Sequence, residues 1–406
     1  MRQSLPEVTL PESVAGRPEP SRGPGPFVLK ILFFLSPLLL LIGLVEFVLW
    51  RTGESWTIQR VIATQRQDSR ALFMRGILDQ GFYRYKFLQI EAVRPKILVV
   101  GSSRVMEFRR EMFGVRSNDF FNAGGMIQDL SDLREFAEKL RPATAPEIMI
   151  LGLDIWWFNG NKILLNGFNN GIAREAGLDW QEHARAFRRF KSGKGRSPAF
   201  KAIRARNENI GIEARAAGVG FRSDGSMQYH FESPKQSGWK FVDRENPPIA
   251  ERIRNNSAQF TSTPGVSQER IELLGKCLDI LGSKNVLVIG FCPPFSTGAV
   301  TLLEASPTQS NFWKETRAQL PRVFRDRHLP YTDASIPTEF RADDSVMMDS
   351  LHAAETFQLT LLERFVSEAR VAKAFPGLGE AIGEALKSKA TDPWYPDYRP
   401  FFNQAR

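Results

Sequence analysis

The chain has 406 residues, 42% of them hydrophobic, and a formal net charge of +9. This length can bury a large core, and the ordinary composition argues against a fibrous, collagenous or disulfide-rich protein. Cys277 and Cys292 lack metal-ligand spacing, which leaves two alternatives: two buried thiols, or one disulfide in an oxidising compartment. Neither a phosphate-binding loop nor a zinc motif occurs, so no cofactor is expected.

Residues 1–26 are polar and proline-rich, which predicts a disordered N-terminal tail. Residues 27–50 form an apolar run that is long enough to cross a bilayer as a helix. A cleavable signal peptide has a shorter apolar core and a small-residue cleavage site, and no such site follows Trp50. The sequence therefore predicts a retained single-pass transmembrane anchor. Basic residues flank it on both sides, so we expect the commoner orientation, a large domain outside the cytoplasmic membrane.

The segment after the anchor, residues 51–95, has helix-like apolar spacing and is predicted to be a helical stalk. Continuous apolar runs then predict three buried strands, at 97–100, 148–153 and 286–291. Amphipathic spacing predicts helices at 130–140, 267–281 and 354–371.

Strands that alternate with helices predict an α/β domain over residues 96–372, with a parallel sheet covered by helices on both faces. Residues 160–260 break this alternation with polar, glycine-punctuated sequence, which indicates an insertion. Residues 373–406 are expected to be a C-terminal tail.

The insertion carries most of the charge imbalance. Residues 181–206 contain nine Lys or Arg residues and one acidic residue, Glu182, with phenylalanines between them. This segment can rest on anionic lipid headgroups or bind an anionic polysaccharide. Alternatively, it is a solvated helix face. Nucleic acid is not expected as a partner for a domain outside the membrane.

The first predicted strand ends in Gly101-Ser102-Ser103, which places a hydroxyl at the carboxyl end of a parallel strand, where open α/β sheets bind ligands. A serine becomes a nucleophile when a base takes its proton, and a neutral imidazole is the usual base. Of the four histidines, only His352 has a carboxylate placed locally to orient it, Asp349. We therefore predict a catalytic triad of Ser103, His352 and Asp349.

These segments resemble the conserved blocks of the SGNH (GDSL-like) hydrolase superfamily. Gly101-Ser102-Ser103 is similar to its Gly-Asp-Ser block, Asn122-Ala-Gly124 to its Asn-x-Gly block, and Asp349 to His352 to its Asp-x-x-His block. The resemblance implies a three-layer, flavodoxin-like fold. It also implies an oxyanion hole that includes the backbone N–H groups of Ser103 and Gly124.

The third block departs from the family. Gly152-Leu-Asp154 stands where the family has Gly-x-Asn, whose amide is the third oxyanion donor. An ionised carboxylate donates nothing and would repel the oxyanion. Three alternatives follow: Asp154 is protonated, it points elsewhere, or it caps the next segment while Asn159 substitutes.

A membrane anchor followed by a Gly-Ser-Ser block resembles the subgroup that includes the teichoic-acid D-alanylation protein and the alginate-type O-acetyltransferases. This implies a periplasmic acyltransferase or esterase that acts on an O-acyl group, acetyl by preference, of an envelope or secreted polysaccharide. The implied partner is a polytopic membrane acyltransferase. The alternative is a catalytically silent, SGNH-like polymer-binding or scaffold subunit of an acylation machinery.

Two further patterns lie beside these motifs. Trp156, Trp157 and Phe158 can form a sugar-stacking platform or core packing, and we expect at least one of them in the core. The run from Phe291 to Phe295 contains two prolines, which we expect to shape the wall of the crevice.

Overall fold

The computed structural model describes residues 25–162, 164, 167–173, 180–193, 196–229, 248–374 and 376–389. The chain divides into two compact units, Met1–Phe47 and Val48–Arg406. The predicted disordered tail, residues 1–26, lies outside the described residues except for Gly25 and Pro26, which begin helix α1 (Gly25–Arg51).

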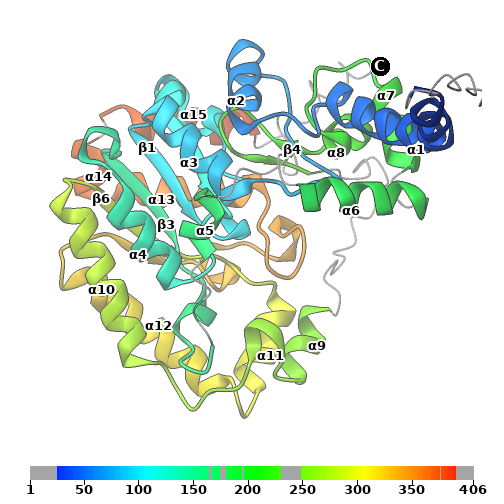
Figure 1. Cartoon of the computed structure of the whole chain (residues 1–406). Coiled ribbons are helices and arrows are strands. Elements are labelled where there is room, and N and C mark those ends of the chain that lie inside the picture. Colours follow the sequence, from blue (N-terminus) through cyan, green and yellow to red (C-terminus); the bar gives the residue numbers. More distant parts are fainter. Residues whose placement is uncertain are drawn as a thin grey trace, which may run out of the picture. The chain divides into compact units, whose positions relative to one another are not determined.

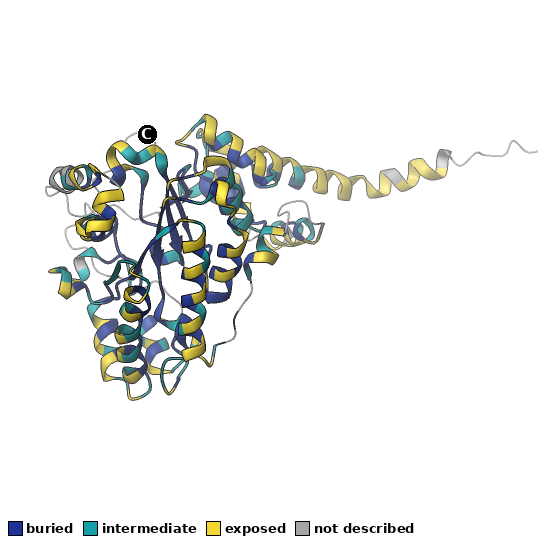
Figure 2. Cartoon of the chain, turned by 90° about the vertical axis from the view of Figure 1, so that its left-hand side faces the viewer, coloured by how far each residue is buried: buried dark blue, intermediate teal, exposed yellow. Residues whose placement is uncertain are grey.

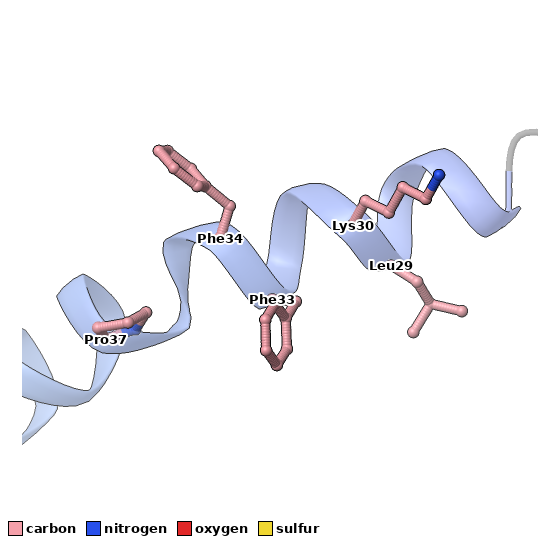
Figure 3. Close-up of a pocket in the computed structure, with 5 residues that line it drawn as sticks. All are labelled: Leu29, Lys30, Phe33, Phe34 and Pro37. Carbon is pink, nitrogen blue, oxygen red and sulfur yellow. The ribbon is translucent and has the colours of Figure 1, made fainter.

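Helix α1 is apolar on all sides. Its segment Phe33–Arg51 has a mean hydropathy of 2.3 and is long enough to cross a membrane. Figure 3 shows Leu29 and Phe33 extending to one side of the helix, with Phe34 and Lys30 extending to the other. Most of its apolar side chains are exposed, whereas a core helix of a soluble protein would bury them. By length, composition and exposure, α1 therefore has the properties of a membrane span.

The second unit is built on a five-stranded parallel sheet in the order β2-β1-β3-β6-β7 (Figure 1). The strands are β1 (Ile97–Gly101), β2 (Phe120–Gly124), β3 (Ile148–Gly152), β6 (Leu287–Cys292) and β7 (Tyr331–Asp333). The three strands predicted from apolar runs are confirmed as β1, β3 and β6. Strands β2 and β7 were not predicted.

Helices cover both faces of this sheet, as predicted, and the strands lie buried between them (Figure 2). Strand β1 shows how the side chains divide, because alternate residues of a strand face opposite sides. Leu98 and Val100 join the core on one face of the sheet, whereas Ile97 and Val99 join the core on the other face. A strand that is buried on both faces is usually apolar at nearly every position, which accounts for the unbroken apolar run of β1.

The helices of the second unit are α2 (Ile58–Gln67), α3 (Phe82–Val93), α4 (Leu130–Lys139), α5 (Gly167–Ala173), α6 (Trp180–Lys191), α7 (Arg196–Arg204), α8 (Ile212–Ala217), α9 (Ile249–Arg254), α10 (Gln268–Ser283), α11 (Thr297–Ala305), α12 (Ser310–Arg325), α13 (Glu355–Ser367), α14 (Ala369–Ala374) and α15 (Leu378–Lys389). Short 3-10 helices include η1 (Ser103–Val105), η2 (Arg110–Asp119) and η4 (Ile155–Phe158). A two-stranded antiparallel ribbon pairs β4 (Gly220–Phe221) with β5 (Met227–Gln228).

The segment predicted as a stalk packs together with part of the insertion. The Gln65 amide on α2 donates to the carbonyl of Phe221 at 2.8 Å, and the Tyr85 hydroxyl on α3 donates to Gln65 at 2.7 Å. Phe73 forms bridges to both Ile210 and Phe221. Residues from Ile58 to Tyr85 and from Ile210 to Tyr229 therefore share one small core beside the sheet.

The end of the chain differs from the predicted tail. Residues 378–389 form α15, and its Leu378 and Ile382 are buried in the core under β1. The small and apolar residues of this segment are spaced to form one face of a helix. A short helix of this kind is stabilised by tertiary packing, here against α13 and η2. Cys277 and Cys292 are both buried and free, so the alternative of two thiols is the one observed.

Candidate active site

The site lies at the carboxyl ends of the central strands. Ser103 follows the end of β1, Asp154 follows the end of β3, and Pro293 follows the end of β6. The strand order places the topological switch point between β1 and β3, which is where doubly wound sheets bind ligands. Gly152 permits this arrangement, because a Cβ there would lie 2.4 Å from Val105 Cγ1 of η1.

The predicted triad residues come together although Ser103 and His352 are far apart in sequence. Ser103 Oγ lies 2.9 Å from His352 Nε2, and His352 Nδ1 lies 2.8 Å from Asp349 Oδ2. This pattern fits a neutral imidazole that donates from Nδ1 to the carboxylate and accepts the serine proton at Nε2. The geometry is that of a nucleophile, a base and an orienting acid.

The Asp349 carboxylate is held in place by the backbone as well as by the imidazole. Its Oδ1 accepts the backbone N–H groups of Leu351 and His352, each at 2.8 Å. Such local bonds are typical of aspartate in a tight turn. The acid and the base are thus fixed by one short loop, whose shape follows from the Asp-x-x-His spacing.

The charges of this loop shift both pKa values in the directions a triad needs. Burial favours a higher pKa for Asp349, but hydrogen bonds from His352 and the backbone outweigh it, so the pKa of Asp349 is lowered. Burial favours a lower pKa for His352, but the hydrogen bond and charge of Asp349 outweigh it, so the pKa of His352 is raised. Asp349 therefore stays ionised, and its charge favours the protonated form of the His352 imidazole.

Arg104, the residue after Ser103, ties the strand ends and the histidine loop together. Its Nη1 donates to Asp154 Oδ1 at 3.0 Å, and its Nη2 donates to the carbonyls of Pro293 at 2.8 Å and Pro294. Its Nε donates to the carbonyl of Leu351 at 2.9 Å, next to His352. The side chain is only 1% exposed, so these charge-assisted bonds form without competition from water.

Asp154 is thereby committed to an ion pair, and of the alternatives for this residue the structure supports the one in which it points elsewhere. Burial raises the pKa of Asp154, while the Arg104 guanidinium and the nearby Ser102 hydroxyl act in the opposite direction. Its side chain does not cap η4. Asn159 does not substitute either, because its amide donates to the Thr261 carbonyl at 2.6 Å and its oxygen accepts the Asn161 N–H at 2.9 Å.

The predicted oxyanion donors require one correction. The Gly124 N–H donates to Asn122 Oδ1 at 2.7 Å, so in this structure it is occupied and is not an open donor. The Ser103 N–H is the first of η1, a position that has no acceptor within the helix, and it remains the predicted donor. The resemblance assigned Gly124 to the oxyanion hole from the Asn-x-Gly spacing alone. That spacing does not show that the side-chain oxygen of Asn122 accepts the Gly124 N–H.

Asn122, which the resemblance placed in the Asn-x-Gly block, has a structural role that sequence reasoning did not assign to it. Its amide donates to the carbonyls of Val105 at 2.8 Å and Phe108 at 2.9 Å, so it fastens β2 to the turn that carries Ser103. A polar residue inside a short apolar run, Phe120 to Gly124, was the available signal.

Glu107 was also missed, and no sequence pattern marks it. It is buried, and neither carboxyl oxygen has a hydrogen-bond partner among the described residues. Burial raises the pKa of Glu107 to about 8, and the charge of His352 opposes this shift. A buried ion pair lies near Glu107. In it Arg109 Nη1 is 3.1 Å from Oε2 of Glu355, the first residue of α13, which follows the loop of Asp349 and His352.

The aromatic run after β3 contributes mainly to the core. Trp157 and Phe158 are buried, which confirms the expectation of core packing, and Trp156 is partly buried. The Trp156 ring packs edge-on against Phe295, and the Arg104 guanidinium lies 4.1 Å from the centre of the Phe295 ring. Aromatic rings therefore enclose the Arg104 pair and keep water away from it.

Within the part of the chain that the structure describes, no group of three or more His, Cys, Asp or Glu side chains is arranged to hold a metal ion. No protein-family model matches this chain, and a search of curated proteins gives no match either.

Proposed function

We propose that the chain is an SGNH-type serine acyltransferase or esterase. In this proposal α1 anchors it in the cytoplasmic membrane, with the second unit on the extracytoplasmic side. Its substrate is an O-acyl group, acetyl by preference, of an envelope or secreted polysaccharide. One observation carries the proposal: the hydrogen-bonded series from Ser103 through His352 to Asp349 at the carboxyl edge of a parallel sheet.

In the first half-reaction, His352 Nε2 accepts the Ser103 proton as Oγ forms a bond to the acyl carbonyl carbon. The Ser103 N–H stabilises the oxyanion. When the tetrahedral intermediate collapses, the imidazolium returns its proton to the departing alcohol oxygen and an acyl-serine remains. In the second half-reaction, His352 deprotonates the acceptor hydroxyl as its oxygen attacks the acyl-serine. When this intermediate collapses, the imidazolium returns the proton to Ser103 Oγ and the free serine is restored.

The acceptor decides between the two reactions. Water gives ester hydrolysis, and a sugar hydroxyl gives transfer. The resemblance to anchored acyltransferases favours transfer, with a polytopic membrane acyltransferase as the partner that supplies acyl groups.

The proposal is tested by covalent labelling of the purified full-length chain with a fluorophosphonate. We expect one adduct, on Ser103, and no adduct in Ser103→Ala. Ser102→Ala is the matched control, because the Ser102 hydroxyl caps the turn instead of contacting His352, so labelling should persist. Labelling that survives Ser103→Ala would refute the assignment.

The second candidate is a catalytically silent polymer-binding or scaffold subunit. The observation that favours it is the oxyanion site, where Gly124 is occupied and Asp154 is paired with Arg104. It predicts no covalent adduct and salt-sensitive retention on anionic polysaccharide. Loss of polysaccharide acylation in a Ser103→Ala strain with normal protein levels would argue against it.

A further inference from the structure

The basic segment predicted from the sequence divides into two parts in the structure. On α6, Arg189 donates to the carbonyls of Gly76 and Ile77, and Arg185 pairs with Glu182 at 2.7 Å. Arg189 therefore holds α6 to a neighbouring segment, whereas the Arg185 pair lies within α6 itself. Exposed basic side chains lie beside exposed apolar ones on α7.

Helix α7 presents an apolar and basic face to solvent. Phe200 is 56% exposed and Ile203 is 39% exposed, while Ala199 and Ala202 are buried on the opposite side. Lys201 and Arg204 lie on the exposed side, and sequence positions 183 to 207 contain no acidic residue. Two exposed apolar side chains among basic residues are typical of a helix that lies in a membrane interface.

Contacts within the second unit place α7 close to the point where α1 ends. The Gly211 N–H, at the start of α8, donates to the carbonyl of Thr52 at 2.8 Å. On α8, Arg215 donates from Nε to the carbonyl of Ala202 and from Nη2 to that of Ala205, each at 3.0 Å. One helix, α8, therefore connects α7 to Thr52, the residue that follows the membrane span.

The chain around that point has the composition of a membrane–water boundary. Trp50 is exposed, and the Trp56 indole donates to the Trp50 carbonyl at 3.0 Å. The Arg60 guanidinium lies 4.0 Å from the centre of the Trp56 ring. Tryptophan and arginine concentrate at the headgroup level of membranes. Residues 50 to 60 are therefore expected at the level of the lipid headgroups. Helix α7 is joined to these residues through α8.

We propose that the exposed face of α7, formed by Phe200, Lys201, Ile203 and Arg204, docks onto the anionic lipid headgroups of the membrane that α1 spans. Phe200 and Ile203 insert at the headgroup boundary, and Lys201 and Arg204 bind lipid phosphates. The inference rests on the anchored arrangement of the proposed function. It gives the second unit a second membrane contact and holds it at the bilayer surface.

The test uses the full-length chain in vesicles of phosphatidylglycerol and phosphatidylcholine with brominated acyl chains. An environment-sensitive fluorophore is attached at Ile203→Cys, and a matched control carries it at Val115→Cys. Val115 is an 84% exposed apolar residue of η2, which packs against α15. Cys277 and Cys292 are buried, and burial raises the pKa of each thiol, so they should label poorly.

We expect several-fold stronger quenching by the brominated lipids at position 203 than at position 115. Pure phosphatidylcholine vesicles, or the charge reversals Lys201→Glu and Arg204→Glu, should remove most of that difference. A label at 203 that is no better quenched than the label at 115, on a chain that floats with the vesicles, would overturn the inference and leave the catalytic proposal intact.

The remaining outcomes are also decisive. Equal quenching on anionic and neutral vesicles would overturn the assignment to anionic headgroups. A spectral change on adding soluble anionic polysaccharide, without lipid quenching, would assign the face to a polymer and overturn the inference. A chain that fails to float would overturn the anchor together with the inference, whereas fluorophosphonate labelling would still report on the triad.

Discussion

Arg104→Met is the sharpest test of how the site is held together. Methionine fills a similar volume, but it donates no hydrogen bond. The Asp154 carboxylate, only 1% exposed, then loses its cation, and removing one partner of a buried ion pair costs about 3–5 kcal/mol of unfolding free energy. Because typical domains have only about 5–15 kcal/mol of total stability, this single change should be severe.

A double variant separates stability from function. Arg104→Met combined with Asp154→Leu removes both charges, and apolar replacements of a buried pair are often neutral in stability. The double variant should therefore recover much of the stability lost in Arg104→Met, although the Pro293, Pro294 and Leu351 carbonyls still lack their donor. It should still label slowly with fluorophosphonate, because the Leu351 carbonyl next to His352 has lost its donor.

The assays are urea unfolding followed by circular dichroism and the labelling rate of Ser103 at low temperature, where each variant stays folded. A single variant within about 1 kcal/mol of the parent would refute the claim that the pair is energetically important. A double variant that labels as fast as the parent would refute the positioning of the histidine loop by Arg104.

Three further predictions concern neighbouring groups. Asp349→Asn removes the group that raises the pKa of His352, so the labelling rate should begin to rise at a lower pH than in the parent. The rate itself should fall by about 10³–10⁴-fold. An unchanged pH profile would contradict this. Glu107 keeps its proton to about pH 8 when folded but releases it near 4.5 when unfolded, so its contribution to stability is lost as pH rises between these values. The unfolding free energy of Glu107→Gln, measured in urea, should therefore exceed that of the parent by more at pH 8.5 than at pH 4.5, with a change on the order of a few kcal/mol. Variant and parent stabilities that change in parallel with pH would refute this. Gly225→Ala should lower the melting temperature more than Gly218→Ala: both glycines have positive φ, but only at Gly225 would a Cβ meet a backbone oxygen of β2, at 2.1 Å, and equal losses would rule out the clash.

Much of the sheet was predictable from local patterns. Strands β1, β3 and β6 are buried on both faces, so each reads as an unbroken apolar run. Strand β2 was missed because it is short and includes the polar residue Asn122. Asn122 can be buried there because its amide donates to the carbonyls of Val105 and Phe108. Strand β7 was missed because its three half-buried residues, Tyr331 to Asp333, lie at the sheet edge and lack an apolar pattern.

The sequence by itself determined the apolar span, the strand that ends in a serine, and the Asp349–His352 loop, because each depends on residues that are neighbours in the chain. Only the tertiary structure decided that Ser103 contacts His352, that Asp154 pairs with Arg104, and that Glu107 lies unpaired near the histidine. The physical reason is that such contacts join distant parts of the chain. Their distances follow from how the strands order in the sheet and how the helices pack on it, and no local propensity carries that information.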